Sequence, residues 1–321
     1  MRIVELDSFG VNPGDMSWEP LQQLGELTLY DRTAEEDVVE RAKDADMILV
    51  NKVNITREII EQLPKLKYIG ELATGYNNID CAAAREHGIV VSNIPAYSTD
   101  SVAQHVFALL LNVTNHVDDF ARQNRNLRWA NHPDFCYWDE PLHELCGKHF
   151  GIIGFGNIGS KVASIAHALG MKVLAATSKA PEQLPEYVEK VDLNSLYALS
   201  DVLSLHCPLV KEGPHANVHM INAETLSKMR PTAILINTGR GPLVDEDAMA
   251  EALQHNKIAA YCADVMEQEP PKADNPLFAQ PHAFLTPHVA WATVEARQRL
   301  MKICVENIKA FLNGSPINVV N

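Results

Sequence analysis

The chain has 321 residues, of which 27 are Lys or Arg and 41 are Asp or Glu, so its formal net charge is −14 at pH 7. That charge argues against nonspecific binding to nucleic acid or to anionic membranes, because both require a basic protein surface. The chain is longer than one hydrophobic core usually supports, so two domains are expected. A mean hydropathy of −0.11 and the lack of any apolar run of about 18 residues indicate a soluble globular protein.

The N-terminal sequence and the cysteines favour a cytoplasmic location. Residues 1–7 become acidic too early for a secretory signal peptide. No two of the six cysteines form a CxxC pair, which predicts neither a disulfide framework nor a zinc site. His215 and His219 share helical spacing without a third ligand nearby, and His206 lies in an apolar strand, so no metal site is expected.

Residues 1–95 alternate short apolar segments with helical ones. Strands are expected at residues 3–6, 47–50, 68–72 and 89–92. Thr33 and Glu36 form a capping-box pattern before an apolar stretch, and Asp80 is expected to cap a short helix that ends at Gly88. This alternation predicts a small α/β domain with a parallel sheet.

The remaining residues predict a second, larger α/β domain. A long helix is expected to start at Asp100 or Ser101, and further strands at residues 150–153, 172–176, 202–206, 233–237, 260–263 and 283–286. Residues 131–139 are aromatic-rich and follow neither the helix nor the strand period, which fits a subunit contact, a substrate lid or a satellite core cluster. A C-terminal helix at residues 296–312 is expected to return to the first domain.

Three glycines mark a dinucleotide-binding turn in the middle of the chain. Gly154, Gly156 and Gly159 form a GxGxxG motif between an apolar strand and an amphipathic stretch that ends at Gly170. In this context the first glycine permits the tight turn, the second lets a pyrophosphate approach the backbone, and the third lets helix and strand pack closely. An ordinary glycine-rich turn is the alternative, but the strand and helix on either side favour a βαβ unit that binds a dinucleotide.

Polar side chains follow three of the expected strands. Arg240 follows residues 233–237, Asp264 follows residues 260–263, and His288 follows residues 283–286, while Glu269 lies on the loop between the last two strands. Because ligands bind at the carboxyl ends of parallel strands, a guanidinium, a carboxylate and an imidazole are expected to converge there.

These residue types suit hydride transfer to a 2-keto acid. Arg240 would bind the substrate carboxylate with its planar fork, and His288 would give a proton to the carbonyl oxygen in reduction and remove it in oxidation. Glu269 would orient the imidazole and favour its protonated form. Taken singly, each residue has a structural alternative. Arg240 could cap a helix, His288 could be a loop histidine with all its hydrogen bonds made, and Glu269 is one of many acids.

In order and spacing these motifs resemble those of the D-isomer-specific 2-hydroxyacid dehydrogenases, and the similarity spans nearly the whole chain. The resemblance implies two Rossmann-like or flavodoxin-like α/β domains with parallel sheets and an active site in the cleft between them. It implies a substrate domain at residues 1–99 and 293–321, an NAD(P)-binding Rossmann domain at residues 100–292, and a homodimer, with the irregular segment at residues 125–145 as the candidate dimer contact.

The resemblance also implies the roles of individual residues. Arg240, Glu269 and His288 are the catalytic residues, and Ala73, Thr74 and Gly75 form a loop that, with Arg240 and His288, holds the substrate. The cofactor-binding residues are Gly154, Gly156, Asn157, Ile158, Gly159, Thr177, Ser178, Lys179, Cys207, Pro208, Asn237, Thr238, Gly239, Asp264, His288 and Ala290. Trp138 and Trp291 are candidates for shaping the pocket, and core packing is the alternative for Trp291.

Within the family, residues 135–139 and 270–277 look most like glycerate dehydrogenases, also called hydroxypyruvate reductases. An NAD(P)-dependent reductase of hydroxypyruvate, giving D-glycerate, or of glyoxylate, giving glycolate, is therefore expected. Other readings are another 2-keto acid, a phosphoglycerate dehydrogenase, or a noncatalytic NAD(H)-sensing protein of the corepressor kind. Formate dehydrogenase is disfavoured because Glu269 stands where that family carries glutamine.

The cofactor choice depends on the residues after the strand at 172–176. An NAD-specific site would place Asp or Glu there to bind the ribose hydroxyls, whereas this chain has Thr177, Ser178 and Lys179. Two hydroxyls and an ammonium could bind a 2′-phosphate, which favours dual or NADP use. The alternative is that Thr177 bonds the ribose and NAD is used.

Overall fold

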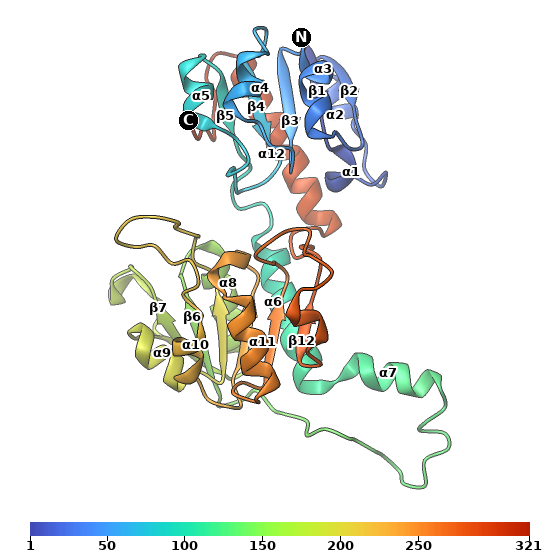
Figure 1. Cartoon of the computed structure of the whole chain (residues 1–321), viewed down its shortest axis with the longest axis vertical. Coiled ribbons are helices and arrows are strands. Elements are labelled where there is room, and N and C mark those ends of the chain that lie inside the picture. The colour runs from blue at the N-terminus through green and yellow to red at the C-terminus, as the bar shows by residue number, and fades with distance from the viewer. The chain divides into compact units, whose positions relative to one another are not determined.

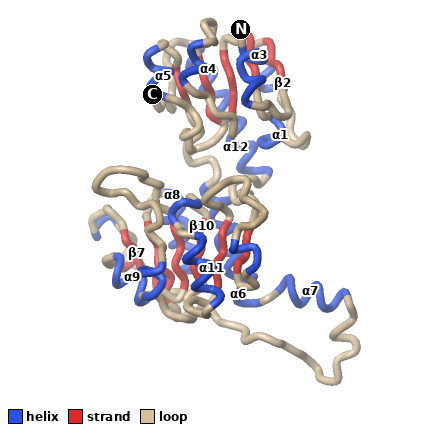
Figure 2. Tube along the Cα trace, viewed as in Figure 1, coloured by secondary structure: helices blue, strands red, loops and turns tan.

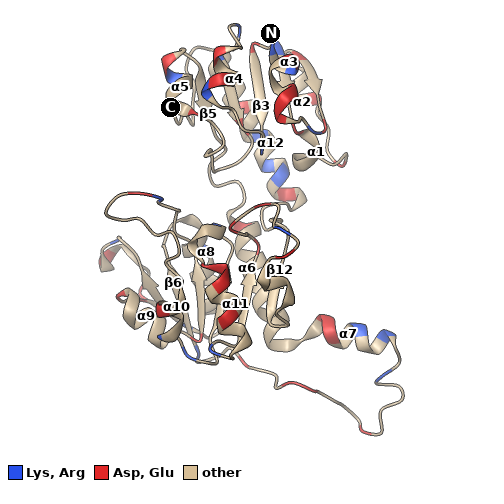
Figure 3. Cartoon of the chain, viewed as in Figure 1, with Lys and Arg blue, Asp and Glu red and all other residues tan.

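The computed structural model describes all 321 residues, which divide into two compact units. Unit 1 consists of residues Met1–Ser98 and Trp291–Asn321, and unit 2 of residues Thr99–Ala290. Both are α/β units built on parallel sheets, in agreement with the fold class expected from the sequence (Figures 1 and 2). Acidic and basic residues are interspersed over both units (Figure 3). None of the helices combines the length and apolar character that crossing a membrane would require.

Unit 1 contains a five-stranded parallel sheet in the order β2-β1-β3-β4-β5. Its strands are β1 (Arg2–Glu5), β2 (Glu26–Leu29), β3 (Met47–Val50), β4 (Tyr68–Glu71) and β5 (Val90–Ser92). Its helices are α1 (Ser8–Val11), α2 (Glu19–Gln22), α3 (Val38–Ala42), α4 (Arg57–Glu61), α5 (Cys81–Glu86) and α12 (Val294–Leu312). The long helix α12 buries Leu300, Cys304 and Ile308 against one face of this sheet.

Two helix starts in unit 1 test the capping rules. Asp80 caps α5 as expected, because its carboxylate accepts a hydrogen bond of 2.8 Å from the Ala83 amide. The capping box at Thr33 and Glu36 was wrong. The Thr33 hydroxyl donates instead to the carbonyl of Leu6, after strand β1, and the helical turn begins at Glu35 without a side-chain cap. A partner distant in sequence thus replaces the local one.

Unit 2 contains a seven-stranded parallel sheet in the order β12-β11-β10-β9-β6-β7-β8. Its strands are β6 (His149–Ile153), β7 (Lys172–Ala176), β8 (Val188–Lys190), β9 (Val202–Leu205), β10 (Ile234–Asn237), β11 (Ala260–Ala263) and β12 (Ala283–Leu285). Its helices are α6 (Thr99–Asn115), α7 (Val117–Arg125), α8 (Asn157–Ala168), α9 (Leu193–Leu199), α10 (Ala223–Ser227) and α11 (Glu246–Gln254). Helix α6 already begins at Thr99, so Asp100 and Ser101 lie inside it rather than capping it.

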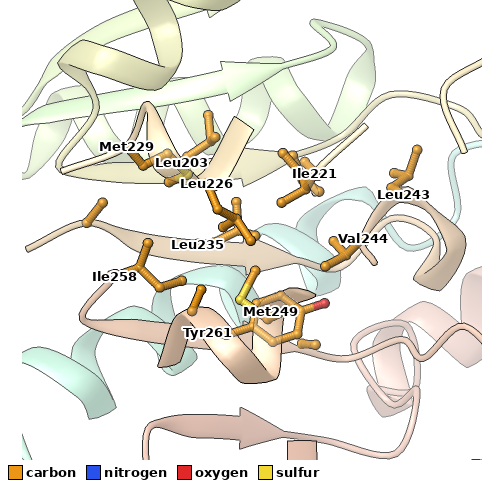
Figure 4. Close-up of a cluster of buried hydrophobic side chains, with 14 of the residues drawn as sticks. Leu203, Ile221, Leu226, Met229, Leu235, Leu243, Val244, Met249, Ile258 and Tyr261 are labelled. Atoms are coloured by element: carbon orange, nitrogen blue, oxygen red, sulfur yellow. The ribbon is translucent and has the colours of Figure 1, made fainter. Parts of the chain in front are cut away.

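Successive strand residues of unit 2 pack on opposite faces of the sheet. In β10, Leu235 belongs to the core that holds α9, α10 and α11 (Figure 4), whereas Ile234 and Ile236 belong to the core that holds α6 and α8. Both faces are therefore covered, which explains why these strands read as nearly continuous apolar runs. All the carboxyl ends point to one edge of the sheet, and the loops at that edge carry the residues described next.

Candidate functional site

The glycine loop (residues 154–159) lies where the strand order of unit 2 reverses. Gly154 follows β6 with φ at +92°, and a Cβ there would come within 2.6 Å of the Cys207 amide, just after β9. A Cβ on Gly159 would come within 2.2 Å of the Gly154 carbonyl oxygen. Only glycine lets the ends of β6 and β9 and the start of α8 approach so closely, which is the geometry of a dinucleotide-binding turn.

The loop leaves hydrogen-bonding groups and space for a dinucleotide. Helix α8 begins at Asn157, and Gly156 before it offers no side-chain cap. The first amides of the helix, at Asn157 and Ile158, are therefore available to an anion. A Cβ on Gly156 would meet no atom within 4 Å. Across the edge, the buried Thr238 hydroxyl has no hydrogen-bond partner within the protein. These features fit a bound pyrophosphate-containing cofactor.

Two asparagines fix the loops that follow β9 and β10, on one side of the glycine loop. The Asn217 amide donates to the Pro208 carbonyl over 2.8 Å, and its oxygen accepts from the Val210 amide over 2.7 Å, which orders the segment after Cys207. The Asn237 amide donates to the Arg240 carbonyl over 2.9 Å. The Asn237 oxygen accepts from the Gly239 amide over 3.1 Å. The turn that carries Arg240 is therefore built by the last residue of β10.

His206 is a neutral residue at this edge. Burial lowers the pKa of His206 to about 4, and its Nε2 lies 2.8 Å from the Ser204 hydroxyl. The imidazole consequently adds no positive charge beside the glycine loop at neutral pH.

The turn after β7 carries hydroxyls and ammonium groups. The Thr177 hydroxyl accepts a hydrogen bond of 3.2 Å from the Lys179 amide, and the Lys179 ammonium lies 5.6 Å from the centre of the Phe155 ring in the glycine loop. Lys190, at the end of β8, donates to the Lys179 carbonyl over 2.6 Å. Ser178 is exposed beside them. A second ammonium thus stands next to the turn, a feature that sequence reasoning missed because it comes from the neighbouring strand.

His288 and Glu269 are in direct contact. The Nδ1 atom of His288 lies 2.7 Å from Oε2 of Glu269, and Oε1 of Glu269 accepts from the Met266 amide over 3.0 Å. Their side chains are 29% and 36% exposed, so the pair is reachable from solvent. Because Nδ1 faces the carboxylate, Nε2 is the nitrogen positioned to exchange a proton with a bound molecule.

Asp264 holds the segment on which His288 lies. Its carboxylate is 1% exposed. It accepts hydrogen bonds from the Thr286 hydroxyl (2.6 Å) and the Val289 and Ala290 amides (2.9 and 2.8 Å). His288 between them has φ at +53°, a conformation that few non-glycine residues adopt without support.

His105 joins this network from helix α6. Its Nε2 atom lies 3.0 Å from the Thr286 hydroxyl and 3.6 Å from Asp264. Sequence reasoning did not single out His105, although a histidine on a helix with a pronounced apolar side is a recognisable signal.

Arg240 lies at the start of the short turn after β10, beside β11. One of its terminal nitrogens donates to the Gly239 carbonyl over 2.8 Å, and the guanidinium has no carboxylate partner in the protein. Arg240, Glu269 and His288 thus follow three adjacent strands, β10, β11 and β12. A guanidinium in this state can receive an anionic ligand through its remaining N–H groups.

The loop after β4 in unit 1 offers unpaired backbone amides. The Ala73 carbonyl accepts from Ile94, and Thr74 donates its hydroxyl to the Ile94 carbonyl over 2.8 Å. The amides of Ala73, Thr74 and Gly75 donate to no protein acceptor. Consecutive free amides on a fixed loop form a site for a carboxylate or another small anion.

Helix α7 and the segment after it, residues 117–142, form an arm that extends away from the rest of unit 2 (Figure 1). Its order comes from internal contacts, since Trp129 donates to the Phe135 carbonyl and the Tyr137 hydroxyl donates to Asn124. The arm nevertheless exposes large apolar side chains, at Val117, Leu127, Trp129, Phe135 (91% exposed), Trp138 (62% exposed) and Leu142. Trp291 is different, because it packs edge-on against Tyr97 within unit 1.

The chain is similar to known proteins over both units. Residues 107–290 match the family model described as the D-isomer specific 2-hydroxyacid dehydrogenase, NAD binding domain. A hydroxypyruvate reductase of Blautia hydrogenotrophica is 46% identical over 100% of both chains. A glycerate dehydrogenase of Methylorubrum extorquens is 42% identical over 89% of this chain and 88% of that one. Among solved structures, the D-lactate dehydrogenase of Aquifex aeolicus, complexed with NAD and lactic acid, has a TM-score of 0.83 and 32% identity, covering 98% of this chain and 96% of that one.

Proposed function

Because this chain belongs to the D-isomer specific 2-hydroxyacid dehydrogenases, we propose that it reduces hydroxypyruvate to D-glycerate, with glyoxylate as an alternative substrate. The observation that carries the proposal is the contact of 2.7 Å between His288 and Glu269. These two residues follow β12 and β11, and Arg240 follows β10, the next strand of the same sheet. The relatives named hydroxypyruvate reductase and glycerate dehydrogenase support the choice of substrate.

The proposed roles follow from the atoms that each residue presents. The nicotinamide cofactor, when bound, supplies the hydride. His288 gives its Nε2 proton to the carbonyl oxygen of the keto acid, and Glu269 keeps the ring oriented and stabilises its positive charge. Arg240 polarises the keto acid and binds its carboxylate. The amides of Ala73, Thr74 and Gly75 bind a carboxylate of the substrate, and the glycine loop holds the pyrophosphate.

The test of class and substrate is a matrix of hydroxypyruvate, glyoxylate, pyruvate and formate against NADH and NADPH, followed by nicotinamide absorbance. Hydroxypyruvate should give the highest kcat/KM. A protein that binds dinucleotide but turns over none of the acids would instead be a nucleotide sensor.

Replacing His288 by alanine tests the proton donor. His288→Ala should lower kcat roughly 10²- to 10⁴-fold, the range of general acid catalysis, while dinucleotide affinity measured by fluorescence stays near the wild-type value. His282→Ala is the matched control, since His282 is an exposed histidine just before β12. Unchanged turnover in His288→Ala would remove this role.

For the cofactor, we propose use of both NADH and NADPH, or of NADPH. The support is the Thr177–Lys179 turn, where the hydroxyls of Thr177 and Ser178 and the ammonium groups of Lys179 and Lys190 lie together and no acid is present. Thr177→Asp should therefore raise KM for NADPH more than KM for NADH, because the new carboxylate would repel a 2′-phosphate. Equal changes in both values would show that this side chain does not meet the adenosine ribose.

A cytoplasmic homodimer completes the proposal. The arm exposes six large apolar side chains, and they suit a contact with a second copy of the chain. The six free cysteines are consistent with a reducing compartment. Light scattering should give the mass of a dimer for the wild type and that of a monomer for the variant Phe135→Ser with Trp138→Ser. A monomeric wild type would contradict the dimer.

A further inference from the structure

The residues between Asp264 and η4 (Pro276–Ala279) form the loop that carries Glu269, which we call the Glu269 loop (residues 265–275). It is not held by sheet hydrogen bonds, yet it must place Glu269 within 2.7 Å of His288. Met266, at its start, donates its amide to Oε1 of Glu269 over 3.0 Å. The position of the carboxylate therefore depends on how the backbone at Met266 and the adjacent Glu267 is fixed.

Glu246, the first residue of helix α11, contacts both ends of this loop. Its Oε1 accepts from the Glu267 amide over 2.7 Å, and its Oε2 accepts from the Asn275 side-chain amide over 2.5 Å. Glu246 is only 8% exposed, and no Lys or Arg pairs with it. Two donors from the Glu269 loop and the positive end of α11 therefore offset the cost of burying this carboxylate.

The segment after Arg240 packs against the same peptide. A Cβ on Gly241 would lie 1.8 Å from the Met266 carbonyl oxygen, so the two backbones touch there. On the exposed side, Nε2 of His219 lies 2.8 Å from the Glu267 carboxylate, while the His219 amide donates to the Pro242 carbonyl over 2.8 Å. The Met266–Glu267 peptide is thus the point where the Arg240 turn and the Glu269 loop meet.

We propose that Glu246 is a positioning residue that fixes both ends of the Glu269 loop, so that Glu269 is held against His288 and beside the Arg240 turn. The bonds run from Glu246 to the Glu267 amide, through the adjacent Met266 amide to Glu269, and from Glu269 to His288. Glu246 touches neither substrate nor cofactor in this scheme. The inference rests on the catalytic roles proposed above for Glu269 and His288.

The two groups that donate to Glu246, the Glu267 amide and the Asn275 side-chain amide, can be tested separately. A glutamine at position 246 can accept a hydrogen bond from only one of them, because its Nε2 would face the other donor. Asn275 cannot simply turn its amide around, since its oxygen already accepts from the Leu277 amide over 3.0 Å. An aspartate at position 275 offers two acceptors, so it can accept both from the Leu277 amide and from the new glutamine Nε2. The double variant Glu246→Gln with Asn275→Asp thus restores the hydrogen bonds between residue 246 and both ends of the Glu269 loop.

Three predicted readouts separate positioning from simple stability. Glu246→Gln should lower kcat roughly 10- to 100-fold, the scale expected for a misplaced catalytic group, with KM for the dinucleotide unchanged. The pH profile of kcat/KM for reduction should move to lower pH, because a misplaced Glu269 no longer stabilises positive charge on the His288 ring. Amide hydrogen exchange in a peptide covering residues 264–276 should become faster.

The double variant Glu246→Gln with Asn275→Asp should recover most of the lost kcat, the wild-type pH profile and the slow exchange. Asp247→Asn is the matched control, because Asp247 is the next residue of α11 and is exposed. Loss of kcat in Glu246→Gln without any change in pH profile or exchange, or a double variant no better than the single one, would overturn the proposal. A wild type that reduces no keto acid would contradict the proposed function, while the exchange experiment would still decide whether Glu246 holds the loop.

Discussion

The two parallel sheets each bury an acidic side chain at their carboxyl edge, and the two side chains differ in their hydrogen-bond partners. Asp264, after β11 in unit 2, is 1% exposed and accepts three hydrogen bonds. Glu5, the last residue of β1 in unit 1, is 0% exposed, and neither carboxyl oxygen has a partner. Burial, and then the negative charge of Asp7, raise the pKa of Glu5 from 4.5 to about 10. The donors around a buried acid, rather than its depth, decide whether it serves as an anion.

Glu71 lies between these extremes. It ends β4, directly before the loop with the free amides, and Oε2 accepts from the Asn78 amide over 3.0 Å while Oε1 has no partner. Burial raises the pKa of Glu71 well above its usual value. A neutral Glu71 places no repelling charge beside the adjacent loop of free amides, so the missing donors in unit 1 are consistent with the proposed substrate site.

The largest effect should come from removing the anion in unit 2. Asp264→Asn sets an amide N–H group against the Ala290 or Val289 amide and so loosens the segment that holds His288 in its left-handed conformation. We expect kcat/KM to fall roughly 100- to 1,000-fold, or about 3 to 4 kcal/mol, the scale of one or two charged hydrogen bonds. Asp274→Asn, at an exposed acid of the same unit, is the control. A variant with near-normal kcat/KM would show that the satisfied carboxylate is dispensable.

Glu5→Gln should have the next largest effect, and on stability rather than activity. The folded state keeps a proton on Glu5 between the unfolded pKa of 4.5 and the folded pKa of about 10, so the free energy of unfolding falls as pH rises through that window. Glutamine removes this dependence. We expect a gain of about 3 kcal/mol at pH 7 and none near pH 4.5, measured by urea unfolding.

The exposed acid Glu36 provides the control for this experiment, since Glu36→Gln should leave the pH dependence of unfolding unchanged. A Glu5→Gln protein that loses stability at pH 7 would mean that Glu5 is ionised, and the contrast with Asp264 would disappear.

Glu71→Gln should give the smallest effect. Burial raises the pKa of Glu71, as it does for Glu5, so the free energy of unfolding falls as pH rises above the usual carboxyl pKa. Glutamine cannot ionise, so the variant should not show this loss. The hydrogen bond from Asn78 offsets part of the burial cost, so the gain in the free energy of unfolding at pH 7 should be smaller than that of Glu5→Gln. KM for hydroxypyruvate should not change, because glutamine is as neutral as the protonated acid. A marked decrease in KM would indicate that Glu71 is charged and repels the substrate.

Sequence patterns predicted the central strands of both sheets closely, with β7 and β11 placed to the residue. They missed β2 and β8, which lie at sheet edges and are short and half polar. An edge strand buries less apolar surface, so the pattern of apolar residues in its sequence is weak.

In the candidate site, too, some residues could be predicted from the sequence and others could not. Arg240, Glu269 and His288 could be proposed because each follows a recognisable strand, and the structure places Glu269 and His288 in contact. The roles of these residues stay predictions. Glu246 could not be singled out, because an acid in the first turn of a helix is common for local reasons.

The sequence by itself determined two α/β units with parallel sheets, the place of the glycine loop and the side chains that follow the strands of unit 2, because these depend on short-range periodicity and turn chemistry. Only the tertiary structure decided which buried acids receive hydrogen bonds. The three donors to Asp264 lie 22 to 26 residues away in the chain, and the Glu267 amide lies 21 residues from Glu246. Such partners meet only when separate strands and helices pack, so no local pattern distinguishes Asp264 from Glu5.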